Sequence, residues 1–130
     1  MNTAEKVIDY IVRKHAERKF VNLPQWSGSY SARYTGGENS NTIVIDDYTT
    51  PIAIADLARK VSVVLGATSA MGYFISQTTS KHVTQLTRAF EDKFGSGAVC
   101  VPMREVVGMP PEEALTKKGL ATLMEQYHGR

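Results

Sequence analysis

The chain has 130 residues, of which 42% are hydrophobic and 22% are charged, and this composition is that of a globular domain rather than a disordered chain. Fifteen Lys and Arg residues against 13 Asp and Glu residues give a net charge of +2, which by itself does not indicate a nucleic-acid ligand. The single Cys100 excludes an intramolecular disulfide, and the sequence shows neither a signal-peptide core nor an unbroken apolar stretch of membrane-spanning length. We therefore expect one domain over residues 1–130 in the cytoplasm, with no membrane partner.

The N-terminal segment has the pattern of an amphipathic helix. Asn2 and Glu5 stand three residues apart, as a helix cap and a carboxylate in the first turn do. Apolar residues then recur at helical spacing, namely Ala4, Val7, Ile8, Ile11 and Val12. These features predict a helix over residues 3–19, and its basic end suits the negative end of the helix dipole.

The next segment changes to the two-residue alternation of a β-strand. Over residues 29–35 one face carries Tyr30, Ala32 and Tyr34, and the other carries Ser29, Ser31, Arg33 and Thr35. The sequence "GGENSN" supplies turn residues at 36–41, and the β-branched run "TIVID" suits a second strand at 42–46. We expect a β-hairpin here.

The middle of the chain predicts a buried helix. Thr50 before Pro51 is typical of a helix start, and residues 51–65 are apolar nearly all round. Residues 71–76 suit a strand, although the span 66–76 could instead form a second short helix.

The last third predicts a helix, a strand and a further helix. Ser80 is expected to cap a helix that ends at Gly95 and carries one apolar stripe, formed by Val83, Leu86, Phe90 and Phe94. A short strand follows at 98–101, and Pro110 opens a last helix. Together the elements predict a single compact α+β (or α/β) domain. In it an N-terminal helix and a β-hairpin precede alternating helices and short strands, which form one small sheet covered by helices.

A basic and aromatic cluster is the leading candidate site. It consists of Arg13, Lys14, Arg18, Lys19, Tyr30, Arg33 and Tyr34. Cations suit phosphates and aromatic rings suit bases, so the cluster predicts binding of single-stranded nucleic acid or RNA. The alternative is that both tyrosines pack in the core and the cations only solvate a helix end.

Two adjacent carboxylates, Asp46 and Asp47, form a second candidate where a hydrophobic strand ends. Such strand ends commonly bind Mg²⁺, which would suit a metal-assisted phosphoryl-transfer or nuclease-like enzyme. Neighbouring strand residues point to opposite faces, however, so both acids reach one metal only if the strand has already ended. The alternative is two turn residues.

Other candidates lack the partners that their chemistry needs. His82 in "KHVT" has no second histidine motif, Ser69 lacks the spacing of a nucleophile elbow, and Cys100 has the flanks of a buried strand. The three histidines are scattered, and no metal-binding motif is present. A helix-turn-helix over residues 54–75 would lack the usual short turn after its first helix, and its second element is poor in base-reading side chains. We therefore predict no catalytic residue, no metal ligand and no cofactor.

These observations favour a small non-enzymatic binding module, with nucleic acid or a nucleic-acid-containing complex as its partner and a homo-oligomer as its assembly. The enzyme centred on Asp46 and Asp47 is the first alternative. A protein–protein adaptor or inhibitor is the second, with the helix after Pro110 docked in a partner groove.

Overall fold

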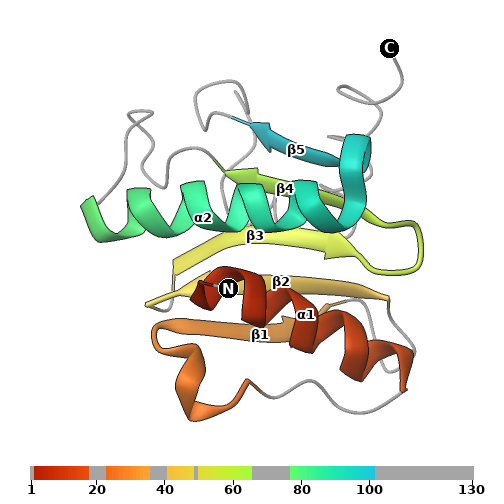
Figure 1. Ribbon diagram of the computed structural model, residues 1–130, viewed down its shortest axis with the longest axis horizontal. Helices are drawn as coiled ribbons and strands as arrows, with labels where there is room; N and C mark the ends of the chain where they lie inside the picture. The colour runs from red at the N-terminus through yellow and green to blue at the C-terminus, as the bar shows by residue number, and fades with distance from the viewer. Residues whose placement is uncertain (1, 18–22, 36–40, 49, 66–76, 102–130) are drawn as a thin grey trace.

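The structure of the chain is a computed structural model that describes residues 2–17, 23–35, 41–48, 50–65 and 77–101 (Figure 1). Its elements are the helices α1 (Thr3–Ala16) and α2 (Gln77–Phe94), the short 3₁₀ helices η1 (Gln25–Ser27) and η2 (Gly95–Gly97), and the strands β1 (Tyr30–Tyr34), β2 (Thr42–Asp47), β3 (Thr50–Asp56), β4 (Val61–Leu65) and β5 (Ala98–Val101). The α+β class predicted from the sequence is confirmed.

The five strands form one sheet in the order β1-β2-β3-β4-β5. The first four are antiparallel neighbours, and β5 pairs with β4 in parallel after the crossover that contains α2. Both helices cover the same face of the sheet, α1 in front of β1 and β2, and α2 in front of β3 and β4 (Figure 1). The sheet is therefore covered on this face by two helices that also pack on each other.

The core lies between these helices and the sheet. It contains Val7, Ile8 and Ile11 of α1, Ile43, Ile45 and Val64 of the sheet, and Leu86 and Phe90 of α2. In the described part of the chain, no helix is long and apolar enough to cross a membrane.

Helix α1 confirms the predicted N-terminal helix. The side chain of Asn2 accepts a hydrogen bond of 2.9 Å from the backbone N–H of Glu5, as a helix cap does. The apolar stripe of α1 is buried against the core. The helix ends at Ala16, and the predicted extension to residue 19 reaches beyond the described residues.

The predicted hairpin is also confirmed. Strands β1 and β2 are antiparallel, with Tyr30 opposite Asp47 and Tyr34 opposite Ile43. Tyr30, Ala32 and Tyr34 face the core, whereas Ser31 and Arg33 are exposed on the other face. The turn at residues 36–40 lies outside the described residues.

The predicted helix over residues 51–65 is wrong, because this segment forms β3, a turn and β4. The turn is built by Asp56, whose carboxylate accepts hydrogen bonds of 3.0 Å from the backbone N–H groups of Ala58 and Arg59. The strands are buried on both faces, with Ala53 in the core and Ile54 and Val63 buried on the opposite side. An apolar run buried on both faces has no polar side, so its periodicity does not distinguish a strand from a buried helix.

Helix α2 confirms the predicted second-half helix but starts earlier. It begins at Gln77, so Ser80 lies within the helix and the predicted cap is wrong. It ends before Gly95, which has a φ of +57° that glycine adopts without steric cost. Strand β5 confirms the predicted strand at 98–101. The expected elements at 66–76 and after Pro110 lie outside the described residues.

A β-bulge near the start of β3 places one extra residue, Ile52, opposite the end of β2. The register with β3 shifts between Ile45 and Asp46, so that Asp46 pairs with Pro51 and Asp47 with Thr50. Along β2 the alternation places Asp47 on the helix-covered face with Ile43 and Ile45, and Asp46 on the other face.

Candidate functional site

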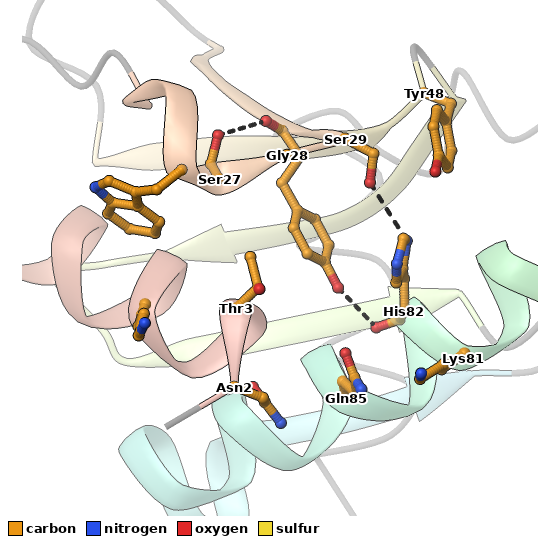
Figure 2. A pocket seen from close by; sticks show the side chains of 12 residues that line it. Asn2, Thr3, Ser27, Gly28, Ser29, Tyr48, Lys81, His82 and Gln85 are labelled. Atoms are coloured by element: carbon orange, nitrogen blue, oxygen red, sulfur yellow. Dashed lines mark hydrogen bonds between the residues drawn. The ribbon is translucent and has the colours of Figure 1, made fainter.

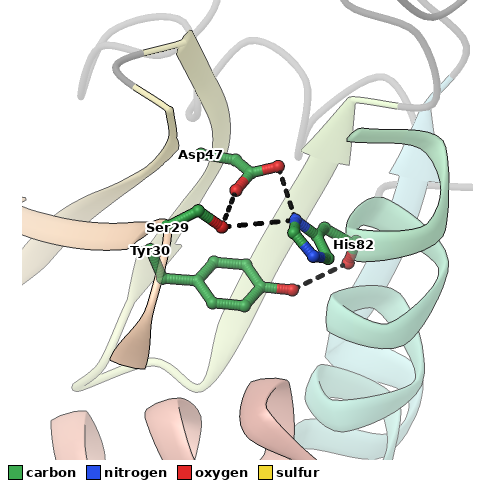
Figure 3. A network of polar contacts seen from close by, with 4 residues as sticks. All are labelled: Ser29, Tyr30, Asp47 and His82. Atoms are coloured by element: carbon green, nitrogen blue, oxygen red, sulfur yellow. Dashed lines mark hydrogen bonds and ion pairs between the residues drawn. The ribbon is translucent and has the colours of Figure 1, made fainter. Parts of the chain in front are cut away.

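A buried carboxylate at the end of β2 organises the candidate site. The Asp47 side chain is fully buried, and each of its oxygens has a partner (Figure 3). The hydroxyl of Ser29 donates to Oδ1 at 2.5 Å, and the Nδ1 atom of His82 lies 2.8 Å from Oδ2. Because both oxygens are engaged, the cost of burying this carboxylate is offset.

The imidazole of His82, near the start of α2, is held on several sides. Its Nδ1 contacts Asp47 and lies 3.4 Å from the Ser29 hydroxyl. The ring stacks on Tyr48, with centroids 6.1 Å apart at 22°, and contacts the Tyr30 ring, with centroids 5.2 Å apart at 43°. Because the carboxylate of Asp47 accepts, we assign a proton to Nδ1 of His82, which leaves Nε2 as the ring nitrogen on the side away from Asp47.

Tyr30 supports this arrangement from the core. Its side chain is 4% exposed, and its hydroxyl donates to the backbone carbonyl of His82 at 3.3 Å. Burial and, second, the negative charge of Asp47 raise the pKa of Tyr30 well above 10.0. The phenol therefore stays protonated as a donor that ties β1 to α2.

A polar cleft of about 490 Å³ opens beside the His82 ring (Figure 2). One side is formed by the start of α1, with Asn2, Thr3 and Lys6, and the other by Lys81, His82 and Gln85 of α2. The segment 26–30 and Tyr48 complete it. Among the residues that the structure describes, the lining contains two lysines and no acidic side chain, which favours an anionic ligand.

Two exposed aromatic rings stand at this cleft. Trp26 is 47% exposed and Tyr48 is 60% exposed, and they are the large hydrophobic side chains that the described residues expose. Both line the cleft. Tyr48 has a φ of +50° directly after β2, and this backbone conformation sets the direction of its side chain.

A basic and aromatic stripe on α1 continues from the cleft. Lys6, Tyr10 and Lys14 follow one another at four-residue spacing, with Arg13 beside them, so they share one side of the helix. The charged ends of Arg13 and Lys14 lie 5.7 and 5.5 Å from the centroid of the Tyr10 ring. The Tyr10 ring meets the Trp26 ring edge-on at 5.9 Å, which joins the stripe to the cleft.

The residues of the predicted basic and aromatic cluster do not lie together in the structure. Arg13 and Lys14 belong to this stripe, where Lys14 also forms an ion pair of 3.7 Å with Glu17. Tyr30 is buried below His82. Arg18 and Lys19 lie outside the described residues.

Tyr34 and Arg33 lie away from the cleft. Tyr34 packs against the core, and its hydroxyl is 2.9 Å from Nδ1 of His15; burial raises its pKa. Arg33 is on the opposite face of the sheet, with its Nε 3.3 Å from a carboxylate oxygen of Asp46.

Asp46 and Asp47 do not converge. Both belong to β2, and their different partners place them on opposite faces of the sheet. No group of three or more His, Cys, Asp or Glu side chains in the described ranges is arranged to hold a metal ion.

Sequence reasoning missed Ser29 as a partner of Asp47. The alternation placed Ser29 opposite the tyrosines, but it lies in the turn before β1, after Gly28 with a φ of +64°. Its hydroxyl donates to Asp47 rather than facing Nε2 of His82, so the cluster is not a Ser–His–Asp nucleophile system. The pairing of His82 with a carboxylate 35 residues earlier had no local signal.

Comparison with family models, with curated proteins and with solved structures finds no match for this chain.

Proposed function

We propose that the chain binds single-stranded nucleic acid at the cleft between α1 and α2. A base stacks on Trp26 or Tyr48, and the neighbouring phosphates contact Lys6 and Lys81. The observation that carries this proposal is that two exposed aromatic rings and two lysines line one cleft, to which the described residues contribute no acidic side chain.

The stripe on α1 supports a polymeric ligand rather than a single nucleotide. Lys6 and Lys14 are eight residues apart, or about 12 Å along the helix at a rise of about 1.5 Å per residue. Tyr10 and Trp26 contact each other between these two cations. A strand seated in the cleft therefore has further cationic and aromatic contacts available along α1.

A single strand suits this surface better than a duplex. Stacking on an exposed ring requires a base whose face is free, and the bases of a duplex are already stacked on each other. The cytoplasmic location, the homo-oligomer and the possibility of a larger nucleic-acid-containing complex stay predictions.

The first test is binding of fluorescently labelled single-stranded DNA and RNA at low salt, followed by anisotropy. Trp26 is the one tryptophan of the chain, so its own fluorescence provides an independent readout, which we expect the bound strand to quench. Replacing Trp26 or Tyr48 with Ala should cost about 1–3 kcal/mol of binding free energy, as the loss of a base–aromatic stack does.

Charge-matched variants separate the cleft from the net charge. Lys81→Ala and Arg33→Ala each remove one positive charge, but Lys81 lines the cleft and Arg33 lies on the other face of the sheet. Lys81→Ala should weaken binding and lower the salt slope by about 0.7, and Arg33→Ala should leave both nearly unchanged. Equal effects of the two variants, or no binding at low salt, would contradict the proposal.

A further inference from the structure

We propose that the cleft also cleaves an RNA strand bound in it, with His82 as the general base that activates a ribose 2′-hydroxyl. This inference rests on the proposed binding of single-stranded nucleic acid. It starts from a group that binding alone does not require, the buried pair of Asp47 and His82.

Nε2 of His82 is the ring nitrogen that the described part of the chain leaves open to a ligand. Nδ1 is engaged by Asp47 and Ser29, and within the described ranges the hydrogen bonds of the ring all involve Nδ1 rather than Nε2. His82 lines the cleft, and its side chain is 20% exposed (Figure 2). In the neutral form of histidine, an imidazole whose Nδ1–H donates a hydrogen bond to a carboxylate carries its lone pair on Nε2. In this form the ring can accept a proton from a ligand at Nε2.

The position of the His82 ring is fixed by Asp47, Tyr30 and Tyr48. Asp47 is a positioning residue, because it is fully buried and acts through Nδ1. Tyr30 lies against one side of the ring (Figure 3). Tyr48 stacks on the ring as well, so the imidazole has few other orientations. A base held in one orientation raises the rate of proton transfer because little freedom is lost in the transition state.

The substrate supplies the nucleophile in this reaction. Nε2 of His82 takes the proton of the 2′-hydroxyl, and the 2′-oxygen forms a bond to the adjacent phosphorus. The bond from phosphorus to the 5′-oxygen of the next nucleotide breaks, and that oxygen takes a proton from water. His82 then returns its proton to the solvent. The products are a 2′,3′-cyclic phosphate and a free 5′-hydroxyl, with no net consumption of water.

The charges of the cleft agree with this step. The phosphorus centre gains negative charge in the transition state, and Lys6 and Lys81 are the cations that line the cleft. The Ser29 hydroxyl donates a hydrogen bond to Asp47 and is therefore not directed at the phosphorus. The 2′-hydroxyl of the substrate itself is adjacent to the phosphorus and serves as the nucleophile.

The test uses a single-stranded DNA that contains one ribonucleotide, with a chelator present. Wild-type protein should cut at the ribonucleotide and leave a cyclic phosphate, while all-DNA and 2′-O-methyl strands bind equally well and stay intact. His82→Gln should bind within about threefold of wild type and cut at least about 100-fold more slowly. His82→Ala should regain cleavage on addition of imidazole, which a purely structural role would not produce.

The outcomes separate the two proposals. Binding of all strands without cleavage overturns the catalytic role and leaves the binding function standing. Cleavage that persists in His82→Gln, or cleavage of the 2′-O-methyl strand, also overturns it. If no strand binds, both proposals are wrong.

Discussion

Replacing Asp47 with Ala is expected to destabilise the fold by about 3–5 kcal/mol. The carboxylate makes two hydrogen bonds, from the Ser29 hydroxyl to Oδ1 and from Nδ1 of His82 to Oδ2, and it is fully buried. A hydrogen bond to a charged group contributes about 1.5–3 kcal/mol, and removing the acceptor leaves two donors without a partner. The loss is measured by urea denaturation followed by far-UV circular dichroism.

The neighbouring carboxylate provides the matched control. Asp46 is on the same strand, but within the described ranges its ion-pair partner is Arg33, whose side chain is 54% exposed, and its Oδ1 has no hydrogen-bond partner there. Asp46→Ala should therefore cost less than about 1 kcal/mol. If the two variants lose equal stability, or if Asp47→Ala loses less than about 1 kcal/mol, the reasoning on the buried carboxylate fails.

Two further predictions concern Tyr30 and two glycines. Because its raised pKa keeps Tyr30 protonated in the folded protein while the unfolded chain releases the proton near 10.0, wild-type stability should fall by about 1.4 kcal/mol per pH unit above pH 10. Tyr30→Phe should lose about 1 kcal/mol at neutral pH and show a flatter alkaline decline in urea denaturation; an identical decline would refute the assignment. A Cβ on Gly97 would lie 2.3 Å from the backbone carbonyl oxygen of Lys60, so Gly97→Ala should cost about 2–3 kcal/mol. A Cβ on Gly95 would have no atom within 4 Å, so Gly95→Ala should lose only the free energy of a left-handed backbone at a non-glycine residue, about 1 kcal/mol. If Gly95→Ala lowers the thermal unfolding temperature more than Gly97→Ala does, the packing argument is contradicted.

The parts of the fold that the sequence predicted correctly are those with local signals. Helix α1 has a cap and a stripe with a polar opposite side, and the hairpin has a two-residue alternation ahead of a turn. Segment 51–65 had neither, because the central strands are buried on both faces. Its informative residue was Asp56, whose carboxylate closes a turn in the middle of the apolar run.

For the candidate site, the sequence indicated the types of side chain but not their arrangement. The sequence predicted Arg13 and Lys14 in one cluster with Tyr30 and Tyr34, whereas the ring that both cations contact in the structure is that of Tyr10. The cleft, however, joins the start of α1 to the start of α2, and the pairing of Asp47 with His82 spans 35 residues. Such a pairing depends on how the helices cross the sheet, which no window of the sequence contains.

The backbone at Tyr48 has a consequence for any effort to make this protein more robust. A φ of +50° at a residue with a bulky side chain lowers the stability of the fold by about 1 kcal/mol. Gly or Asn at this position would remove most of this loss. Heat selection of random variants would therefore favour replacing Tyr48, since 60% of its side chain is exposed and contributes little to the core. The most thermostable variants would lack one of the two exposed aromatic rings that line the cleft. Replacement of Tyr48 would therefore raise thermal stability and weaken ligand binding at the same time.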